Sequence, residues 1–190
     1  MNIYLFLFDG FSDWEIAYLT PELHKSEKVN LITFSKDGGP VTSMGGLKIL
    51  PDISIEKVIA DDVSLLILPG GEDWNERKLE FVSELTKTVH DHRKPIAAIC
   101  AATTFLGSKG YLDHVKHVSN DLNYLKAVAP EYKGDALYQP EMFASDQNII
   151  TANGTAPIEF AREIFRKIEL WEESEIEKWY QLFKNGIWEA

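Results

Sequence analysis

Short apolar runs recur along the first half of the chain, and each is followed by a break in the pattern. They span Ile3–Phe8, Val29–Phe34, Leu65–Leu68 and Ile96–Ile99. The first run ends in Asp-Gly, the second in Lys-Asp-Gly-Gly-Pro and the third in Pro-Gly-Gly. Apolar runs of this length, closed by turn residues, are typical of strands that are covered on both faces. The pattern therefore predicts four buried strands.

The segments between these runs carry apolar residues at helical spacing, which predicts helices between the strands. One helix follows the first run, another follows the third, and a short one follows the fourth directly and stops at Gly107. The residues that set the spacing are Trp14, Ala17, Tyr18 and Leu23, then Phe81, Leu85, Thr88 and Val89, then Phe105 and Leu106. Strands that alternate with helices form crossover units, so we predict an α/β fold with a mostly parallel sheet.

The pattern changes after Asn120. Residues Met142–Ser145 and Asn148–Ala152 predict an antiparallel hairpin, and Pro157–Ile168 predicts an amphipathic helix. The last stretch, Leu170–Ala190, is acidic and rich in tryptophan, and it predicts a C-terminal amphipathic helix. We expect one domain over residues 1–168, with residues 169–190 packed on that domain or on a partner subunit. Use of this helix purely as an interaction module is a further alternative.

Composition narrows the classes of function. The 190 residues include 45% hydrophobic and 26% charged residues, and 30 acidic side chains against 19 Lys and Arg give a formal net charge of −11. This balance argues against nucleic-acid and anionic-membrane partners, which need a basic face. No apolar run approaches the ~18 residues of a spanning helix, and the first residues lack a signal-peptide pattern. The single cysteine excludes an intramolecular disulfide, so we expect a cytoplasmic protein.

The carboxyl ends of parallel strands form the usual binding edge of such a sheet, and the chain places Cys100 at one of them. Small residues surround Cys100, as a sharp strand-to-helix turn requires, and the N-terminus of the following helix would favour a thiolate. The alternative is that Cys100 is only a small buried hydrophobic residue. Neither a dinucleotide-binding glycine motif nor a P-loop is present.

Other candidate groups are weaker when each is taken alone. Glu15 is an acid in the first turn of a predicted helix, which is a common position for a carboxylate. The Pro69-Gly70-Gly71 turn offers free backbone N–H groups for an oxyanion hole, or it is an ordinary turn. The five histidines lack the spacing of a metal site, so we expect no metal.

Taken together, these motifs resemble the ThiJ/PfpI superfamily, whose relatives include the class I glutamine amidotransferases. The resemblance is carried by Ala97–Ala102, Phe8–Glu15, Leu68–Gly71 and Val41–Asp52, and it runs from about residue 2 to 168. It implies a flavodoxin-like three-layer sandwich, a nucleophile elbow with Cys100 as its reactive thiol, and a homodimer without a cofactor. It also implies that a protonated Glu15 hydrogen-bonds the sulfur and lowers the thiol pKa, and that the Gly71 and Ala101 N–H groups bind an oxyanion.

The chain also departs from the superfamily pattern. Protease-like members carry a histidine directly after the cysteine, where this chain has Ala101. Other members take a histidine from a segment that resembles Val118–Asp121, and here Asn120 stands in its place. Because an amide cannot relay a proton, we expect neither glutaminase nor peptidase activity. Asn120 instead joins Gly71 and Ala101 as a candidate for substrate binding.

Two functions remain open at this stage. The first is an enzyme in which the Cys100 thiolate attacks a small reactive carbonyl compound and Glu15 moves the proton, assisted by Asn120, Asp121 or His117. The second is a non-catalytic sensor of oxidative stress that signals through oxidation of Cys100.

Overall fold

A seven-stranded sheet forms the centre of the molecule. The computed structural model describes residues 1–188, and the strand order is β5-β2-β1-β6-β7-β9-β8. Every neighbouring pair is parallel except β8 and β9, which form the predicted antiparallel hairpin. The strands are β1 (Asn2–Phe6), β2 (Asn30–Ser35), β5 (Ile53–Ser54), β6 (Val63–Leu68), β7 (Ile96–Ile99), β8 (Phe143–Asp146) and β9 (Ile149–Ala152).

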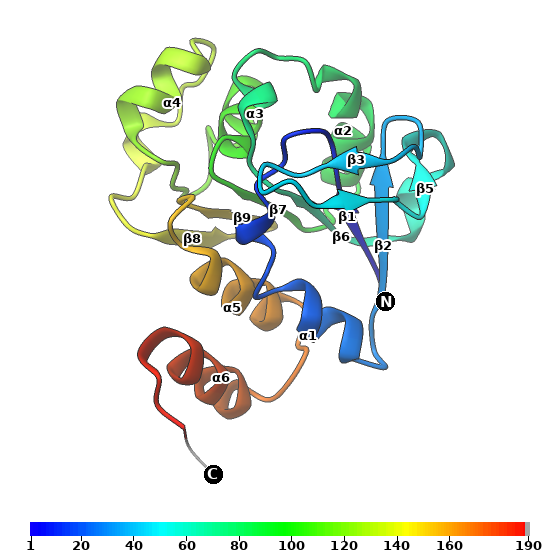
Figure 1. Ribbon diagram of the computed structural model, residues 1–190. Helices are drawn as coiled ribbons and strands as arrows, with labels where there is room; N and C mark the ends of the chain where they lie inside the picture. The colour runs from blue at the N-terminus through cyan, green and yellow to red at the C-terminus, as the bar shows by residue number, and fades with distance from the viewer. Residues whose placement is uncertain (189–190) are drawn as a thin grey trace.

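Helices cover both faces of this sheet, which gives three layers (Figure 1). On one face lie α2 and α3 with α4 beside them, and on the other lie α1 and α5 (Figure 1). The helices are α1 (Thr20–Lys25), α2 (Ser83–Asp91), α3 (Ala102–Ser108), α4 (Leu122–Val128), α5 (Pro157–Lys167) and α6 (Glu173–Asn185). The predicted α/β fold of the flavodoxin-like type, with a mostly parallel sheet, is confirmed.

The central strands are buried on both faces, as their continuous apolar sequences predict. The side chains of β7 are all fully buried, and so are nearly all those of β1 and β6. Phe6 lies at the centre of an aromatic cluster, with its ring centroid 5.3 Å from that of Phe34 and 5.9 Å from that of Trp74. Burying large rings in this way is a strong source of stability. The cluster gives the carboxyl ends of β1, β6 and β7 a rigid base.

A second sheet of two strands lies beyond the carboxyl end of β1. It pairs β3 (Val41–Thr42) with β4 (Lys48–Ile49) in antiparallel fashion. The Gly10 N–H donates to Thr42 O at 2.8 Å, and the Thr42 N–H donates to Asp9 Oδ1 at 2.8 Å. These bonds tie the hairpin to the loop after β1 and bring Met44 to the binding edge of the main sheet.

The region after β1 differs from the predicted single helix. A 3₁₀ turn at Asp13–Glu15 comes first, and α1 begins only at Thr20, with Pro21 in its first turn. Trp14 is 45% exposed and does not join the core. The spacing of Trp14, Ala17 and Tyr18 was therefore misread as one continuous helix, because a large aromatic residue at a helical interval does not by itself show what it packs against.

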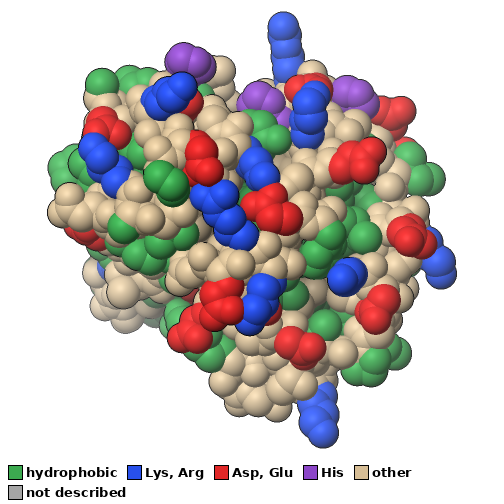
Figure 2. Space-filling view, turned by 90° about the horizontal axis from the view of Figure 1, so that it is seen from above, with side chains coloured by type: hydrophobic (Ala, Val, Ile, Leu, Met, Phe, Trp, Pro, Cys, Tyr) green, Lys and Arg blue, Asp and Glu red, His purple; other side chains and the backbone are tan. Residues whose placement is uncertain are grey.

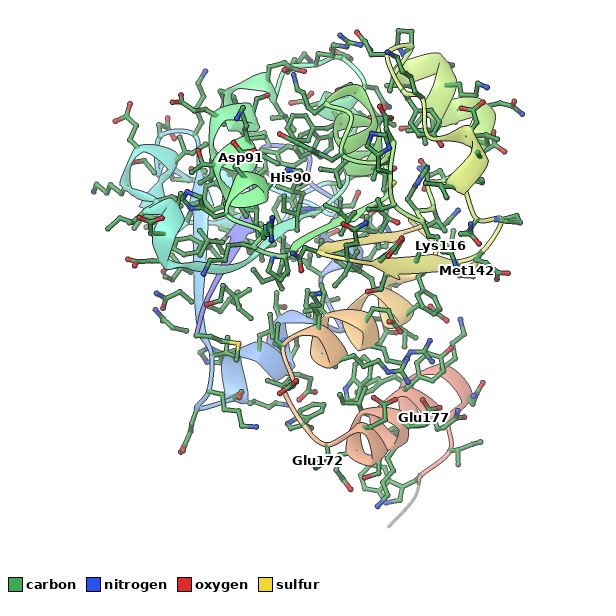
Figure 3. The ribbon with its side chains drawn as sticks, turned by 180° about the vertical axis from the view of Figure 1, so that it is seen from behind. His90, Asp91, Lys116, Met142, Glu172 and Glu177 are labelled. Atoms are coloured by element: carbon green, nitrogen blue, oxygen red, sulfur yellow. The ribbon has the colours of Figure 1, made fainter. Side chains whose placement is uncertain are left out.

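The C-terminal helix α6 packs on α5 of the same chain. The Trp179 and Phe165 rings meet edge to face with centroids 4.8 Å apart, and Ile176 is buried beside them. At the rim, Lys184 pairs with Glu159 at 2.8 Å. Glu172 and Glu177 are labelled in Figure 3, at the start and in the middle of this helix. The predicted helix covered all of Leu170–Ala190, but the observed one is Glu173–Asn185, and residues 189–190 lie outside the described part.

Charges of both signs are mixed over the surface. Figure 2 shows Lys and Arg side chains among Asp and Glu, with no continuous basic area on the face in view. Within residues 1–188, no helix has both the length and the apolar character needed to cross a bilayer.

Candidate active site

Cys100 occupies a strained turn between β7 and α3. Its backbone φ is +59°, a left-handed conformation that is uncommon for a residue with a side chain. The Cys100 N–H donates to Ala152 O at 2.9 Å, and Cys100 O accepts from the Thr103 N–H at 3.1 Å. The first bond holds the residue to β9 and the second starts the helix. Strain of this kind persists where the surroundings enforce it, and here it presents the sulfur at the edge of the sheet.

Glu15 brings a fully buried carboxyl group to the same place. The Gly70 N–H donates to Glu15 Oε2 at 2.6 Å, and the Ser12 side chain lies close enough to lower the pKa of the carboxyl. Glu15 Oε1 makes no hydrogen bond of regular geometry among the described residues, although Cys100 lies close enough for each side chain to shift the pKa of the other. Oε1 is therefore the carboxyl oxygen available to hold a proton.

Gly70 makes this approach possible. A Cβ atom at residue 70 would lie 2.7 Å from Cys100 Cβ, 2.7 Å from Glu15 Oε2 and 2.8 Å from Glu15 Oε1. Real Cβ atoms do not approach other atoms so closely, so any side chain here would separate the acid from the cysteine. The Leu68–Gly71 motif thus serves to let two side chains meet as well as to form a turn.

Burial raises the pKa of the Glu15 carboxyl to about 7. The Gly70 N–H and the side chains of Cys100 and Ser12 oppose this shift, but loss of hydration is the larger effect. Near neutral pH the carboxyl is consequently divided between its charged and uncharged forms. This agrees with the expectation that Glu15 can be protonated in the folded protein.

Burial also raises the pKa of the Cys100 thiol, to about 11, and the negative charge of Glu15 raises it further. The Asn120 amide and the Ala101 N–H act in the opposite direction. We expected the pKa to fall because of the helix N-terminus and a protonated Glu15, and this expectation was wrong for the resting site. Desolvation of the sulfur and the charge of Glu15 outweigh the opposing effects of Asn120 and Ala101.

Asn120 is the polar side chain that contacts the sulfur from the other side. Its Nδ2 donates to Cys100 Sγ at 3.2 Å, while its Oδ1 accepts from the Gly154 N–H at 2.9 Å. The carbonyl oxygen of Asn120 accepts from Asn153 Nδ2 at 3.0 Å. With both ends of the amide engaged, Asn120 fixes the position of the sulfur but cannot act as a base.

The other two residues considered as helpers lie elsewhere. Asp121 caps α4, where its carboxylate accepts from the N–H groups of Asn123 and Tyr124. His117 is fully buried, with Nδ1 against Val115 O at 2.8 Å and Nε2 against the Tyr132 hydroxyl at 2.6 Å. Both therefore have structural roles, and of the three candidates only Asn120 contacts the sulfur.

A cavity of about 260 Å³ opens in front of Cys100. Two of its lining residues, Gly71 and Ala101, are the ones expected to supply oxyanion N–H groups, and the Ala101 N–H contacts the sulfur. The cavity is lined by Ser12, Trp14, Met44, Gly71, Glu72, Asn75, Cys100, Ala101, Asn120 and Tyr124. None of the five histidines is in this lining. His90, for example, is at the end of α2 (Figure 3), near the opposite edge of the sheet where β7 begins.

Several residues of the site were not identified from the sequence. Trp14 and Met44 line the cavity from separate loops, and in the same lining the Tyr124 hydroxyl donates to Asn75 Oδ1 at 2.6 Å. Gly154 lies so close that a Cβ there would be 2.8 Å from Cys100 Sγ. The Asn-Gly pair at 153–154 was the available signal, but it indicated only a turn.

Comparison with known proteins places these observations in context. A family model described as the DJ-1/PfpI family matches residues 1–167. The "Uncharacterized protease YoaZ" of Bacillus subtilis is 38% identical over 97% of this chain and 91% of its own length, and the "Deglycase TK1284" of Thermococcus kodakarensis is 30% identical over 63% of this chain and 72% of its own. The crystal structure of the DJ-1 superfamily protein Atu0886 from Agrobacterium tumefaciens is 37% identical, covers 98% of both chains and superposes with a TM-score of 0.89.

Proposed function

Because the chain belongs to the DJ-1/PfpI family, we propose that it is a cysteine-dependent enzyme that acts on small reactive carbonyl compounds. The observation that carries the proposal is the placement of Cys100 on a strained turn, beside the buried carboxyl of Glu15 and facing an open cavity. A nucleophile, a proton carrier and room for a substrate are thus combined. Relatives named as deglycases support a substrate of this class.

The first chemical step is addition of the sulfur to a carbonyl carbon. The Cys100 proton moves to Glu15 Oε1, Sγ forms a bond to the carbon, and the carbonyl π electrons move to the oxygen. The N–H groups of Gly71 and Ala101 stabilise the charge on that oxygen, and Glu15 returns the proton to give a hemithioacetal. A carboxyl with a pKa of about 7 suits this task, because it both accepts and donates a proton near neutral pH.

Completion of a glyoxalase-like cycle needs only water. In methylglyoxal the aldehyde carbon is oxidised and the adjacent ketone carbon is reduced, so that methylglyoxal and one water give lactate without an external oxidant or reductant. Glu15 is the group placed to move a proton between the two carbons, and hydrolysis of the resulting thioester releases Cys100. The cavity of about 260 Å³ accommodates a molecule of this size.

Proteolysis and glutamine hydrolysis have less support, despite the word protease in the names of two relatives. Both reactions expel a poor leaving group that must receive a proton from a general acid beside the cysteine. The side chain that hydrogen-bonds Cys100 Sγ from the cavity side is the Asn120 amide, which cannot supply one.

The decisive experiment measures lactate formation from methylglyoxal by the purified protein. We expect Cys100→Ala to abolish turnover and Glu15→Gln to reduce it strongly, since each removes a group that bonds or carries a proton. Glu84→Gln is the matched control, because Glu84 is an exposed acid on α2 outside the cavity. Equal turnover by wild type and Cys100→Ala would overturn the proposal.

A sensor of oxidative stress is the second candidate, favoured by the asparagine that stands where a catalytic base is expected. Oxidation of Cys100 to the sulfinate adds two oxygens, or about 32 Da, to the intact mass. Stoichiometric gain of that mass under mild peroxide, without turnover of any carbonyl compound tested, would support the sensor over the enzyme.

We further propose that the protein is a homodimer in the cytoplasm. A single cysteine that forms no disulfide within the chain suits a reducing compartment. Light scattering during size-exclusion chromatography tests the dimer, and a monomeric mass at micromolar concentration would contradict it. Fractionation of the source cells tests the location.

A further inference from the structure

The cavity in front of Cys100 has an unusual distribution of charge. Among its ten lining residues there is no Lys, Arg or His, and Glu72 is the one carboxylate. The neighbouring acids Asp73 and Glu76 both pair with Lys78. Glu72, in contrast, is exposed and takes part in no ion pair within residues 1–188. Its charge therefore acts on whatever enters the cavity.

Glu72 is also well placed relative to the reacting atoms. It follows Gly71 directly, and the 3₁₀ turn Glu72–Trp74 begins with Gly71 at a φ of +152°. A Cβ on Gly71 would lie 2.7 Å from the ring of Phe8 and 2.8 Å from Gly10 O, so the backbone before Glu72 is held tightly. The side chain thus projects from a fixed point at the mouth of the cavity.

We propose that Glu72 selects substrates by charge, so that the site accepts neutral and cationic carbonyl compounds and rejects those that carry a carboxylate. The charged form of Glu15 acts in the same direction from beside Cys100. An anionic substrate would need a cationic side chain to bind it, and the lining contains none. As a statement about substrates, this inference rests on the function proposed above.

Apolar residues in the same lining strengthen this selection. Trp14 and Met44 contribute apolar surface to the lining, and each is nearly half exposed. Apolar walls reduce the screening of a charge by water, and the face of an indole ring attracts cations. An ammonium or guanidinium group on a substrate would therefore find both a carboxylate and an aromatic ring in the cavity lining.

The test uses thiol reagents of opposite charge, because labelling of Cys100 does not require carbonyl turnover. Trimethylammonioethyl and sulfonatoethyl methanethiosulfonate are similar in size, and each transfers its thioalkyl group to a thiolate with release of methanesulfinate. The rate with the cationic reagent is divided by the rate with the anionic one, and this ratio is normalised to that of free mercaptoethanol. Cys100 is the single thiol of the chain, so the labelled residue is unambiguous.

We expect the normalised ratio to fall about threefold to tenfold in Glu72→Gln and to fall further in Glu72→Lys, as for loss and reversal of one nearby charge. High salt should reduce the effect, since the Debye length is then only about 3 Å. Glu84→Gln makes the same change in net charge on α2 and should leave the ratio unchanged. Equal ratios in wild type, Glu72→Gln and Glu72→Lys would overturn the inference, as would an equal fall in Glu84→Gln.

A second arm separates this inference from the proposed function. Turnover of phenylglyoxal is compared with turnover of its trimethylammonio- and carboxy-substituted forms. Preference for the cationic form, lost in Glu72→Gln, would support both proposals together. A labelling ratio that depends on Glu72, without turnover of any of the three, would overturn the enzyme and leave charge selection at Cys100 intact. If the carbonyl compounds are turned over, but neither turnover nor the labelling ratio depends on Glu72, charge selection is overturned and the proposed enzyme is left intact.

Discussion

The most informative single change is Glu15→Gln, because it separates the role of Glu15 in catalysis from its effect on the free energy of unfolding. Glutamine has the same shape, and its side-chain oxygen can still accept from the Gly70 N–H that now bonds Oε2 at 2.6 Å. The amide cannot ionise. The substitution therefore removes the titration of a fully buried carboxyl while it keeps the packing.

The magnitude follows from the pKa of the carboxyl in the two states. Burial raises it from the ordinary 4.5 to about 7 in the folded protein. Each pKa unit corresponds to about 1.4 kcal/mol, so the shift corresponds to about 3 kcal/mol. Because the folded state holds the proton more tightly, this stability is fully present below about pH 4.5 and is lost as the pH rises through about 7. Wild type and Glu15→Gln should thus have similar unfolding free energies near pH 4.5, while above about pH 8 the variant should be more stable by up to about 3 kcal/mol.

Urea denaturation at a series of pH values measures this directly. In the difference between the unfolding free energies of wild type and variant, the contributions of groups that titrate equally in both cancel. Glu84→Gln is the control for the removal of an exposed acid. We expect the variant to gain stability at alkaline pH and to lose methylglyoxal turnover. A difference in unfolding free energy that is the same at pH 5 and pH 8.5 would refute the reasoning, since it would mean that Glu15 ionises equally in the folded and unfolded chain.

Three further predictions, the last with a control substitution, test other parts of the structure. Asn120→Ala removes the donor 3.2 Å from Cys100 Sγ and should raise the thiol pKa. Iodoacetamide should then alkylate Cys100 about threefold to tenfold more slowly at pH 8. An unchanged rate of alkylation would show that this hydrogen bond does not hold the sulfur. Gly154→Ala places a Cβ 2.8 Å from Sγ and should lower both carbonyl turnover and the unfolding free energy, the latter by about 1–3 kcal/mol in urea denaturation. Trp179→Ala should lower the unfolding free energy by about 3–5 kcal/mol in the same measurement. Trp188→Ala, at a residue that is 78% exposed, should change the unfolding free energy by less than about 0.5 kcal/mol. Equal effects of the two substitutions would mean that α6 does not stabilise the domain.

The long elements of the fold were predictable because each has a clear hydrophobic pattern. Four apolar runs became β1, β2, β6 and β7, and Asp146-Gln147 marked the β8–β9 hairpin. The strands β3, β4 and β5 have two residues each, which is too short to show any period. Their pairing depends on tertiary contacts, such as the bonds between Thr42 and the loop after β1. Helix α4 was missed for a similar reason, since its start depends on the cap that Asp121 provides.

The site was predictable in its members but not in its electrostatics. Cys100 and Glu15 were found because their neighbours in the sequence form motifs that require those residues. The rise in the thiol pKa depends on how much water the folded chain removes from the sulfur, and no local motif records that. The walls of the cavity combine Trp14, Met44 and Tyr124 from three distant segments. Only the assembled fold shows that they share one space.

The raised thiol pKa bears on the choice between the two candidate functions. Peroxide oxidises the thiolate and not the thiol, so a sensor needs a thiolate in its resting state. Burial and the charge of Glu15 place the Cys100 pKa at about 11, so at neutral pH the resting sulfur is mainly a thiol. An enzyme needs the thiolate only while substrate is bound, when the N–H groups of Gly71 and Ala101 stabilise the product of its attack and Glu15 holds the proton. A resting thiol thus agrees better with the catalysis proposed above than with the sensor. Rapid oxidation of Cys100 by stoichiometric peroxide at pH 7, as fast as at pH 10, would reverse this conclusion.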